Sequence, residues 1–151
     1  MSETAGDVHV RWQGGRAYEV SRSGATPIII DGNRTKGPGP VEALLASLAS
    51  CSAIDVVDYL EKRRTPATRL DIRIAAVRAP SPPRRVLSAI LEFMIDGDGI
   101  DRVHAERSIA LAFGTYCSVA ASLAADVALS TRLVLNGVAG TEVSHATRRG
   151  A

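Results

Sequence analysis

The N-terminal part of the chain alternates between apolar and polar positions, with the two-residue period of half-buried β-strands. This alternation places Val8, Val10 and Trp12 on one face. A pair of glycines at positions 14 and 15 is typical of a tight turn, so the next segment is expected to return as a hairpin partner. Three strands are predicted here, over residues 8–12, 16–20 and 27–30.

A long apolar segment follows, and it predicts one helix from Pro40 to about Arg64. Proline suits the first helical turn because its missing N–H needs no partner there, and Pro66 ends the pattern. At roughly 1.5 Å per residue, a helix of this length spans more than about 30 Å. A helix that is apolar on most sides must be buried on most sides, and three strands cannot cover it. We therefore expect a homodimer whose two copies share a core.

The rest of the chain predicts three more strands and two more helices. Strands are expected over residues 70–77, 86–95 and 131–137, with a helix as the alternative for 86–95. Helices are expected over residues 101–116 and 117–127, with a break near Gly114. The order βββ-α-ββ-αα-β is typical of an α+β fold. We expect a single domain over residues 1–151, with a core at about 8–136 and a frayed tail at about 141–151.

Composition and charge narrow the classes of function. The net charge of +2 is small and no basic stripe is interleaved with aromatic residues, so no nucleic-acid partner is expected. The first residues lack the apolar region of a signal peptide. Residues 41–60 are the most apolar window, but they contain three carboxylates and make a poor membrane span. We expect a cytoplasmic protein with no membrane partner, and no histidine spacing suits a metal site.

The two cysteines are the candidate reactive residues. Thiols stay reduced in the cytoplasm, so Cys51 and Cys117 are each expected to be either a small core residue or a reactive group. Asp55 lies one helical turn after Cys51, and its charge would raise the pKa of that thiol. A reactive thiolate at this position therefore needs a nearby cation, such as an arginine. Cys117 lies at an expected helix start, which favours a thiolate, so Cys117 is predicted to be the more acidic thiol.

Two segments resemble those of a known family. "DGNRTKGPGPVEALLASLASCSAIDVVDYLEKRR" resembles the first-cysteine segment of the OsmC/Ohr proteins, the osmotically inducible and organic-hydroperoxide-resistance family, and "GTYCSVAASL" resembles the second. "RWQGGRAYEV" is similar to the N-terminal strand pair of that family. The resemblance covers roughly residues 8–136 and is closest to the YhfA-like subgroup. It implies an intertwined α+β homodimer, in which antiparallel sheets wrap two long central helices.

The resemblance also implies a thiol-dependent peroxidase acting on organic hydroperoxides. Cys51 matches the peroxidatic cysteine, which attacks the peroxide and becomes a sulfenic acid. Cys117 matches the resolving cysteine, which condenses with that sulfenic acid to a disulfide. An external dithiol, a lipoyl group in some members, would then reduce the disulfide, and no bound cofactor is implied. Arg16 falls where Ohr-type members carry the arginine that activates the thiolate, and Arg34 is the alternative cation.

One position departs from the Ohr pattern. In Ohr-type members a carboxylate follows the proline directly, where this chain has Val41. Glu42 comes one residue later, about 180° around the helix from Cys51 at about 100° per residue. Glu42 is therefore expected to face elsewhere, so that either Asp55 takes over as the carboxylate that orients the cation or efficient peroxide reduction is absent.

Two functions stay open at this point. The first is the peroxidase, with an apolar substrate pocket whose expected lining is Leu44, Leu48, Phe113 and Tyr116. The alternative is a non-catalytic dimeric module that binds an apolar or thiol-reactive small molecule through the same pocket. The carboxylate missing after Pro40 favours the alternative, whereas the presence of both cysteines favours the peroxidase.

Overall fold

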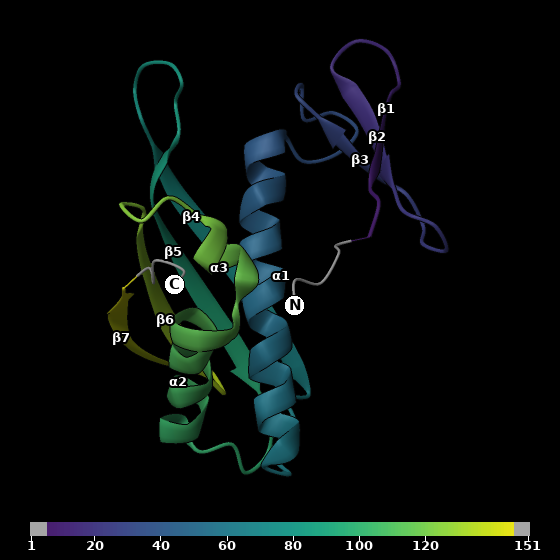
Figure 1. Cartoon of the computed structure of the whole chain (residues 1–151). Helices are drawn as coiled ribbons and strands as arrows, with labels where there is room; N and C mark the ends of the chain where they lie inside the picture. Colours follow the sequence, from purple (N-terminus) through teal and green to yellow (C-terminus); the bar gives the residue numbers. More distant parts are fainter. Residues whose placement is uncertain (1–5, 147–151) are drawn as a thin grey trace, which may run out of the picture. The chain divides into compact units, whose positions relative to one another are not determined.

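The computed structural model describes residues 6–146. The chain forms two compact units, Met1–Ala46 and Ser47–Ala151. Helix α1 (Pro40–Lys62) begins in the first unit and continues through the second (Figure 1). The expectation of a single domain stays a prediction, and each unit is described below by itself.

The first unit contains the predicted three-stranded sheet. Its strands are β1 (His9–Trp12), β2 (Ala17–Ser21) and β3 (Ile28–Asp31), and both neighbouring pairs are antiparallel. Val8, Val10 and Trp12 are 62%, 63% and 64% exposed, so the face that was expected to be half-buried is open in the single chain. These three residues are apolar surface that another molecule can cover.

The predicted long helix is confirmed as α1. Its fully buried side chains lie on one face. The fully buried positions recur every four residues, as expected for one helical face. They are Leu48, Ser52, Val56 and Leu60. Ile54 is 62% exposed although it is apolar. The apolar surface of α1 at Leu44 and Ile54 is therefore not covered within the chain.

The second unit contains a four-stranded sheet in the order β4-β5-β6-β7. The strands are β4 (Arg69–Arg78), β5 (Val86–Asp96), β6 (Ala128–Leu135) and β7 (Val138–His145). Leu91, Phe93 and Ile95 of β5 are completely buried, so the strand interpretation of this segment is confirmed over the helical one. The expected antiparallel arrangement holds for the described strand pairs except β5–β6, which is parallel because three helical segments cross over between them.

The crossover consists of α2 (Arg102–Leu111), the π-helical turn η1 (Ala112–Tyr116) and α3 (Ser118–Ser122). The break predicted near Gly114 is the π-helical turn, which the Cys117 N–H closes by donating to the carbonyl of Ala112, 2.8 Å away. The second predicted helix is shorter than expected, since α3 ends at Ser122 rather than at residue 127.

Strand β7 was missed by the sequence prediction. Residues 141–145 were expected to belong to a frayed tail, but they lie in β7, which pairs with β6 from Arg132↔Glu142 to Leu129↔His145. The prediction of a frayed tail is therefore wrong for residues 141–145, and residues 147–151 lie outside the described part of the chain. The consequence for the site is that β7 brings a histidine next to the helical crossover.

Candidate functional site

The second unit brings the two cysteines together although they are far apart in the sequence. Helix α3 lies beside α1 (Figure 1), and the Ser118 hydroxyl of α3 is 3.9 Å from the Cys51 sulfur. The two thiols lie close enough for each to affect the ionisation of the other. Both cysteines are free thiols. The fold thus forms a dithiol site at the contact of α1 with the segment 117–119.

Cys51 is partly buried, and burial alone would hinder its ionisation. Hydrogen bonds from the Val119 N–H and the Cys117 thiol act in the opposite direction. The hydroxyl and the N–H of Ser118 add to this effect. Together these hydrogen bonds outweigh burial, so the pKa of Cys51 lies below its ordinary value.

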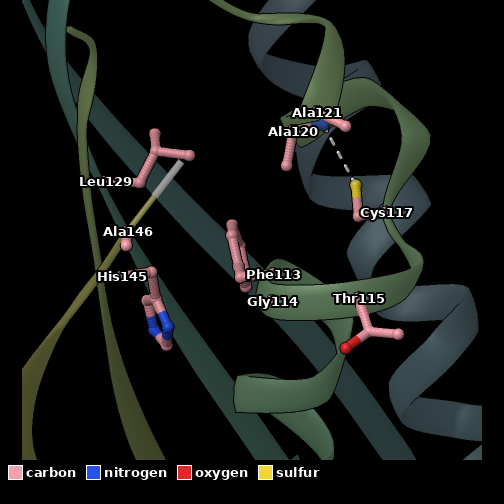
Figure 2. Close-up of a pocket in the computed structure, with 9 residues that line it drawn as sticks. All are labelled: Phe113, Gly114, Thr115, Cys117, Ala120, Ala121, Leu129, His145 and Ala146. Carbon is pink, nitrogen blue, oxygen red and sulfur yellow. Dashed lines mark hydrogen bonds between the residues drawn. The ribbon is translucent and has the colours of Figure 1, made fainter. Parts of the chain in front are cut away.

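Cys117 has the opposite electrostatics. It is 3% exposed, and burial raises the pKa of its thiol to about 11. The Ala120 N–H, 3.4 Å from the Cys117 sulfur, acts in the opposite direction but too weakly to compensate, and the influence of Cys51 contributes to the rise (Figure 2). The prediction that Cys117 is the more acidic thiol is therefore wrong, because desolvation outweighs the N–H groups of the helix start.

A small cavity of about 50 Å³ lies beside Cys117. Figure 2 shows its lining, to which Phe113, Leu129 and His145 contribute the largest side chains. The rings of Phe113 and His145 stack with centroids 4.9 Å apart, and Thr131 Oγ1 is 2.7 Å from Nε2 of His145. Burial lowers the pKa of His145, which favours the neutral imidazole. The wall behind Cys117 is thus largely apolar and uncharged.

The first unit forms an arginine–glutamate pair. Arg34 Nε donates to Glu42 Oε1 across 2.6 Å, and Glu42 Oε2 accepts the Gly39 N–H at the start of α1 across 2.7 Å. The second contact is half of a capping box, which fixes the glutamate at the helix start. Glu42 therefore holds a guanidinium although it does not follow the proline directly.

Asp31 positions the loop that carries Arg34, and the sequence prediction missed it. Its buried carboxylate accepts N–H groups of Asn33, Thr35 and Lys36 at 2.9–3.1 Å. These bonds, the one from Asn33 first, lower the pKa of Asp31 to about 2. Arg34 itself has a positive φ of 58°, a conformation that needs such support in a residue other than glycine.

Arg16, the other candidate cation, lies beside the same loop. Its backbone carbonyl accepts the Gly32 N–H across 3.0 Å. A Cβ on Gly32 would meet Arg16 Nε at 3.2 Å, so the guanidinium stem passes close over this glycine. The first unit thus holds both candidate arginines around the loop after β3.

Comparison with known proteins identifies the family. The family model described as OsmC-like protein matches residues 32–132, a span that includes both cysteines, Arg34 and Glu42. The chain belongs to the OsmC-like family. This OsmC-like protein is 31% identical to Protein YhfA of Escherichia coli (strain K12) over 115 residues, which cover 76% of this chain and 86% of YhfA.

Solved structures support the same fold. An OsmC-like protein from Mycoplasma pneumoniae has a TM-score of 0.75 at 15% identity, covering 89% of this chain and 99% of the other. The organic hydroperoxide resistance protein OhrB of Bacillus subtilis has a TM-score of 0.58 at 15% identity, covering 86% and 98%. The expected OsmC-like α+β fold is therefore confirmed.

Helix α1 is long and apolar enough to cross a membrane, but it is the core helix of this fold, and no membrane protein is indicated.

The residues expected to line a substrate pocket are spread over different environments in this OsmC-like protein. Phe113 lines the cavity beside Cys117. Leu48 belongs to the buried stripe of α1, whereas Leu44 and Tyr116 are 42% and 62% exposed. Their common pocket stays a prediction.

Asp55 shows no cation partner among the described residues of this OsmC-like protein. Its Oδ2 is enclosed and has no hydrogen-bond partner in residues 6–146. Burial first, and then the charge of Asp58, raise the pKa of Asp55. The proposed orienting role of Asp55 therefore has no arginine to act on within this part of the structure.

The described residues also contain no group of three or more histidines, cysteines or carboxylates that could hold a metal ion.

Proposed function

We propose that this protein is a cytoplasmic thiol peroxidase that reduces organic hydroperoxides and serves in oxidative-stress defence. The observation that carries the proposal is the contact of α3 with α1, where the Cys51 sulfur lies 3.9 Å from the hydroxyl of Ser118, the residue next to Cys117. The lowered pKa of Cys51 at this contact supports it. A nucleophilic thiolate beside a second thiol is the arrangement that a two-cysteine peroxidase needs. The solved structure of an organic hydroperoxide resistance protein with the same fold supports this choice of substrate class.

The first chemical step belongs to Cys51. Its thiolate attacks the terminal oxygen of the hydroperoxide, so an S–O bond forms while the O–O bond breaks. The sulfur supplies the electron pair, and the alkoxide that leaves takes a proton from water to become the alcohol. Cys51 is then a sulfenic acid, oxidised by two electrons.

The second step belongs to Cys117. Its sulfur attacks the sulfur of the Cys51 sulfenic acid, so that an S–S bond forms and the S–O bond breaks. The hydroxyl group leaves with the proton of the Cys117 thiol as water. An external dithiol, such as a lipoyl group, then reduces the disulfide and restores both thiols. Arg16 and Arg34 remain the candidate cations for the thiolate, on the resemblance to the family.

The proposal is tested by adding one equivalent of cumene hydroperoxide to the reduced protein and counting free thiols. We expect two thiols to be lost per chain as one intrachain disulfide. Trypsin would release Cys51 and Cys117 in separate peptides, residues 37–62 and 108–132, so mass spectrometry identifies the bond. Cumyl alcohol, which lacks the O–O bond, is the matched control and should leave both thiols free. Unreacted thiols after hydroperoxide treatment would instead favour the non-catalytic binding module.

We also propose that the protein is a homodimer, because the open faces of β1 and α1 are apolar. The expected molar mass in solution is twice 15.9 kDa. Ile54→Asp on α1 should shift the protein toward monomers, since it places a charge in the shared core. Val103→Asp, on an equally exposed valine of α2, is the matched control. A native protein of single-chain mass by light scattering would contradict the proposal.

A further inference from the structure

Ser118 is a residue at the dithiol site to which neither the sequence nor the family resemblance gave a role. It follows Cys117 directly and is the first residue of α3. Its side chain is exposed, and its hydroxyl lies 3.9 Å from the Cys51 sulfur. Ser118 therefore contacts the sulfur atom that the proposed reaction oxidises, and a ligand in solvent can reach it.

The hydroxyl of Ser118 is available because another atom caps its helix. The side chain that caps a helix start belongs to the N-cap residue, which directly precedes the first helical residue. In α3 the Cys117 sulfur fills this role, accepting the Ala120 N–H across 3.4 Å. The Ser118 hydroxyl is thus directed across to α1 instead of back to its own backbone.

The hydrogen-bond donors around Cys51 share one origin. Within residues 47–146, the groups that stabilise its thiolate come from the three consecutive residues Cys117, Ser118 and Val119. Among them, the Ser118 hydroxyl can be removed by mutation without changing the backbone. Hydrogen bonds to a charged acceptor are stronger than those between neutral groups, so a hydroxyl beside a thiolate has a measurable effect.

We propose that Ser118 is a catalytic residue of this protein, whose hydroxyl donates a hydrogen bond to the Cys51 sulfur and holds it as the thiolate that attacks the hydroperoxide. The role in turnover rests on the proposed peroxidase function. The hydrogen bond itself does not, since it acts on the thiol before any substrate arrives. No proton is consumed in this role: the proton that leaves Cys51 goes to solvent, and Ser118 keeps its own.

The test is the rate at which iodoacetamide alkylates Cys51 as a function of pH, followed on the tryptic peptide of residues 37–62. Ser118→Ala should slow alkylation at neutral pH by about tenfold, the effect of one hydrogen bond to a charged group. It should also move the pH midpoint of the reaction upward. Ser118→Thr keeps a hydroxyl and should retain most of the native rate.

Ser122→Ala is the matched control, because the Ser122 hydroxyl bonds the Ser118 carbonyl, 2.8 Å away, and leaves the sulfur untouched. Arg16→Ala and Arg34→Ala complete the comparison. If Ser118→Ala alkylates like the native protein while an arginine variant is slow, the inference is overturned. If Ser118→Ala is slow but native Cys51 does not reduce cumene hydroperoxide, the peroxidase function fails and the role of Ser118 at the thiolate stands.

Discussion

Replacing Cys51 by serine is expected to reduce hydroperoxide consumption to the rate of buffer alone. A serine hydroxyl is ionised to a negligible extent at neutral pH, so the nucleophile of the first step disappears. The donors from residues 117–119 cannot compensate, because they stabilise an anion that serine does not form. Cys51 is only partly buried, and oxygen for sulfur is a small change in volume, so the fold should persist.

The measurement is the loss of cumene hydroperoxide in the presence of excess dihydrolipoamide. Cys51→Ser retains Cys117, whose buried thiol has its pKa raised to about 11 and should stay reduced. The free-thiol count should therefore remain one per chain after exposure to peroxide. Turnover by Cys51→Ser above the buffer rate would show that Cys117 or another group is the peroxidatic residue, and the roles proposed above would be wrong.

Replacing Cys117 by serine is expected to stop the cycle after a single oxidation. Cys51 keeps its N–H donors from α3, so it should still attack one equivalent of hydroperoxide. Without the second sulfur no intrachain disulfide can form, and the sulfenic acid accumulates. Serine is a good N-cap, so the start of α3 should be preserved in this variant.

Dimedone trapping on the peptide of residues 37–62 provides the measurement, with the native protein as control. We expect one dimedone adduct per Cys117→Ser chain and almost none on the native chain, where the disulfide forms first. If Cys117→Ser prevents even the first oxidation, the assignment of peroxidatic and resolving cysteines is reversed. If the variant turns over repeatedly at the native rate, Cys117 has no resolving role.

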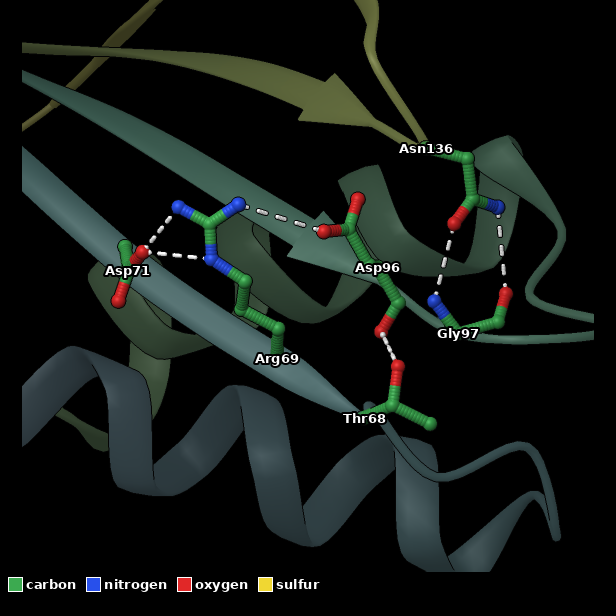
Figure 3. A network of polar contacts seen from close by, with 6 residues as sticks. All are labelled: Thr68, Arg69, Asp71, Asp96, Gly97 and Asn136. Atoms are coloured by element: carbon green, nitrogen blue, oxygen red, sulfur yellow. Dashed lines mark hydrogen bonds and ion pairs between the residues drawn. The ribbon is translucent and has the colours of Figure 1, made fainter.

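The sequence predicted the long helix and six of the strands because their apolar periodicity is strong. Strand β7 was missed although Asn136-Gly137 is a typical hairpin turn pair, with positive φ values of 47° and 80°. The polar residues of β7 do not show a clear two-residue period. Tertiary contacts complete the turn, since the Asn136 side chain bridges the N–H and carbonyl of Gly97 at 3.0 and 3.2 Å (Figure 3).

The sequence predicted which cysteines form the site, but it did not predict which of the two thiols is more acidic. The family resemblance implied that Cys51 and Cys117 are partners, but it could not show how deeply each is buried, and burial reverses their expected order of acidity. Helical geometry predicted that Glu42 faces away from Cys51. It could not show that a loop would bring Arg34 within 2.6 Å of the Glu42 carboxylate. Ser118 has no sequence signature of its own, because its role depends on α3 lying against α1.

The cap of α3 has a consequence for how the fold responds to redox chemistry. The Cys117 sulfur both accepts the Ala120 N–H and is the proposed partner in the disulfide. A helix of five residues is marginal without its terminal contacts, and the Cys117 sulfur supplies one of them. We therefore expect alkylation or oxidation of Cys117 to weaken the cap and to lower the free energy of local unfolding of α3. The order of this short helix is thereby linked to the thiol chemistry that it helps to organise.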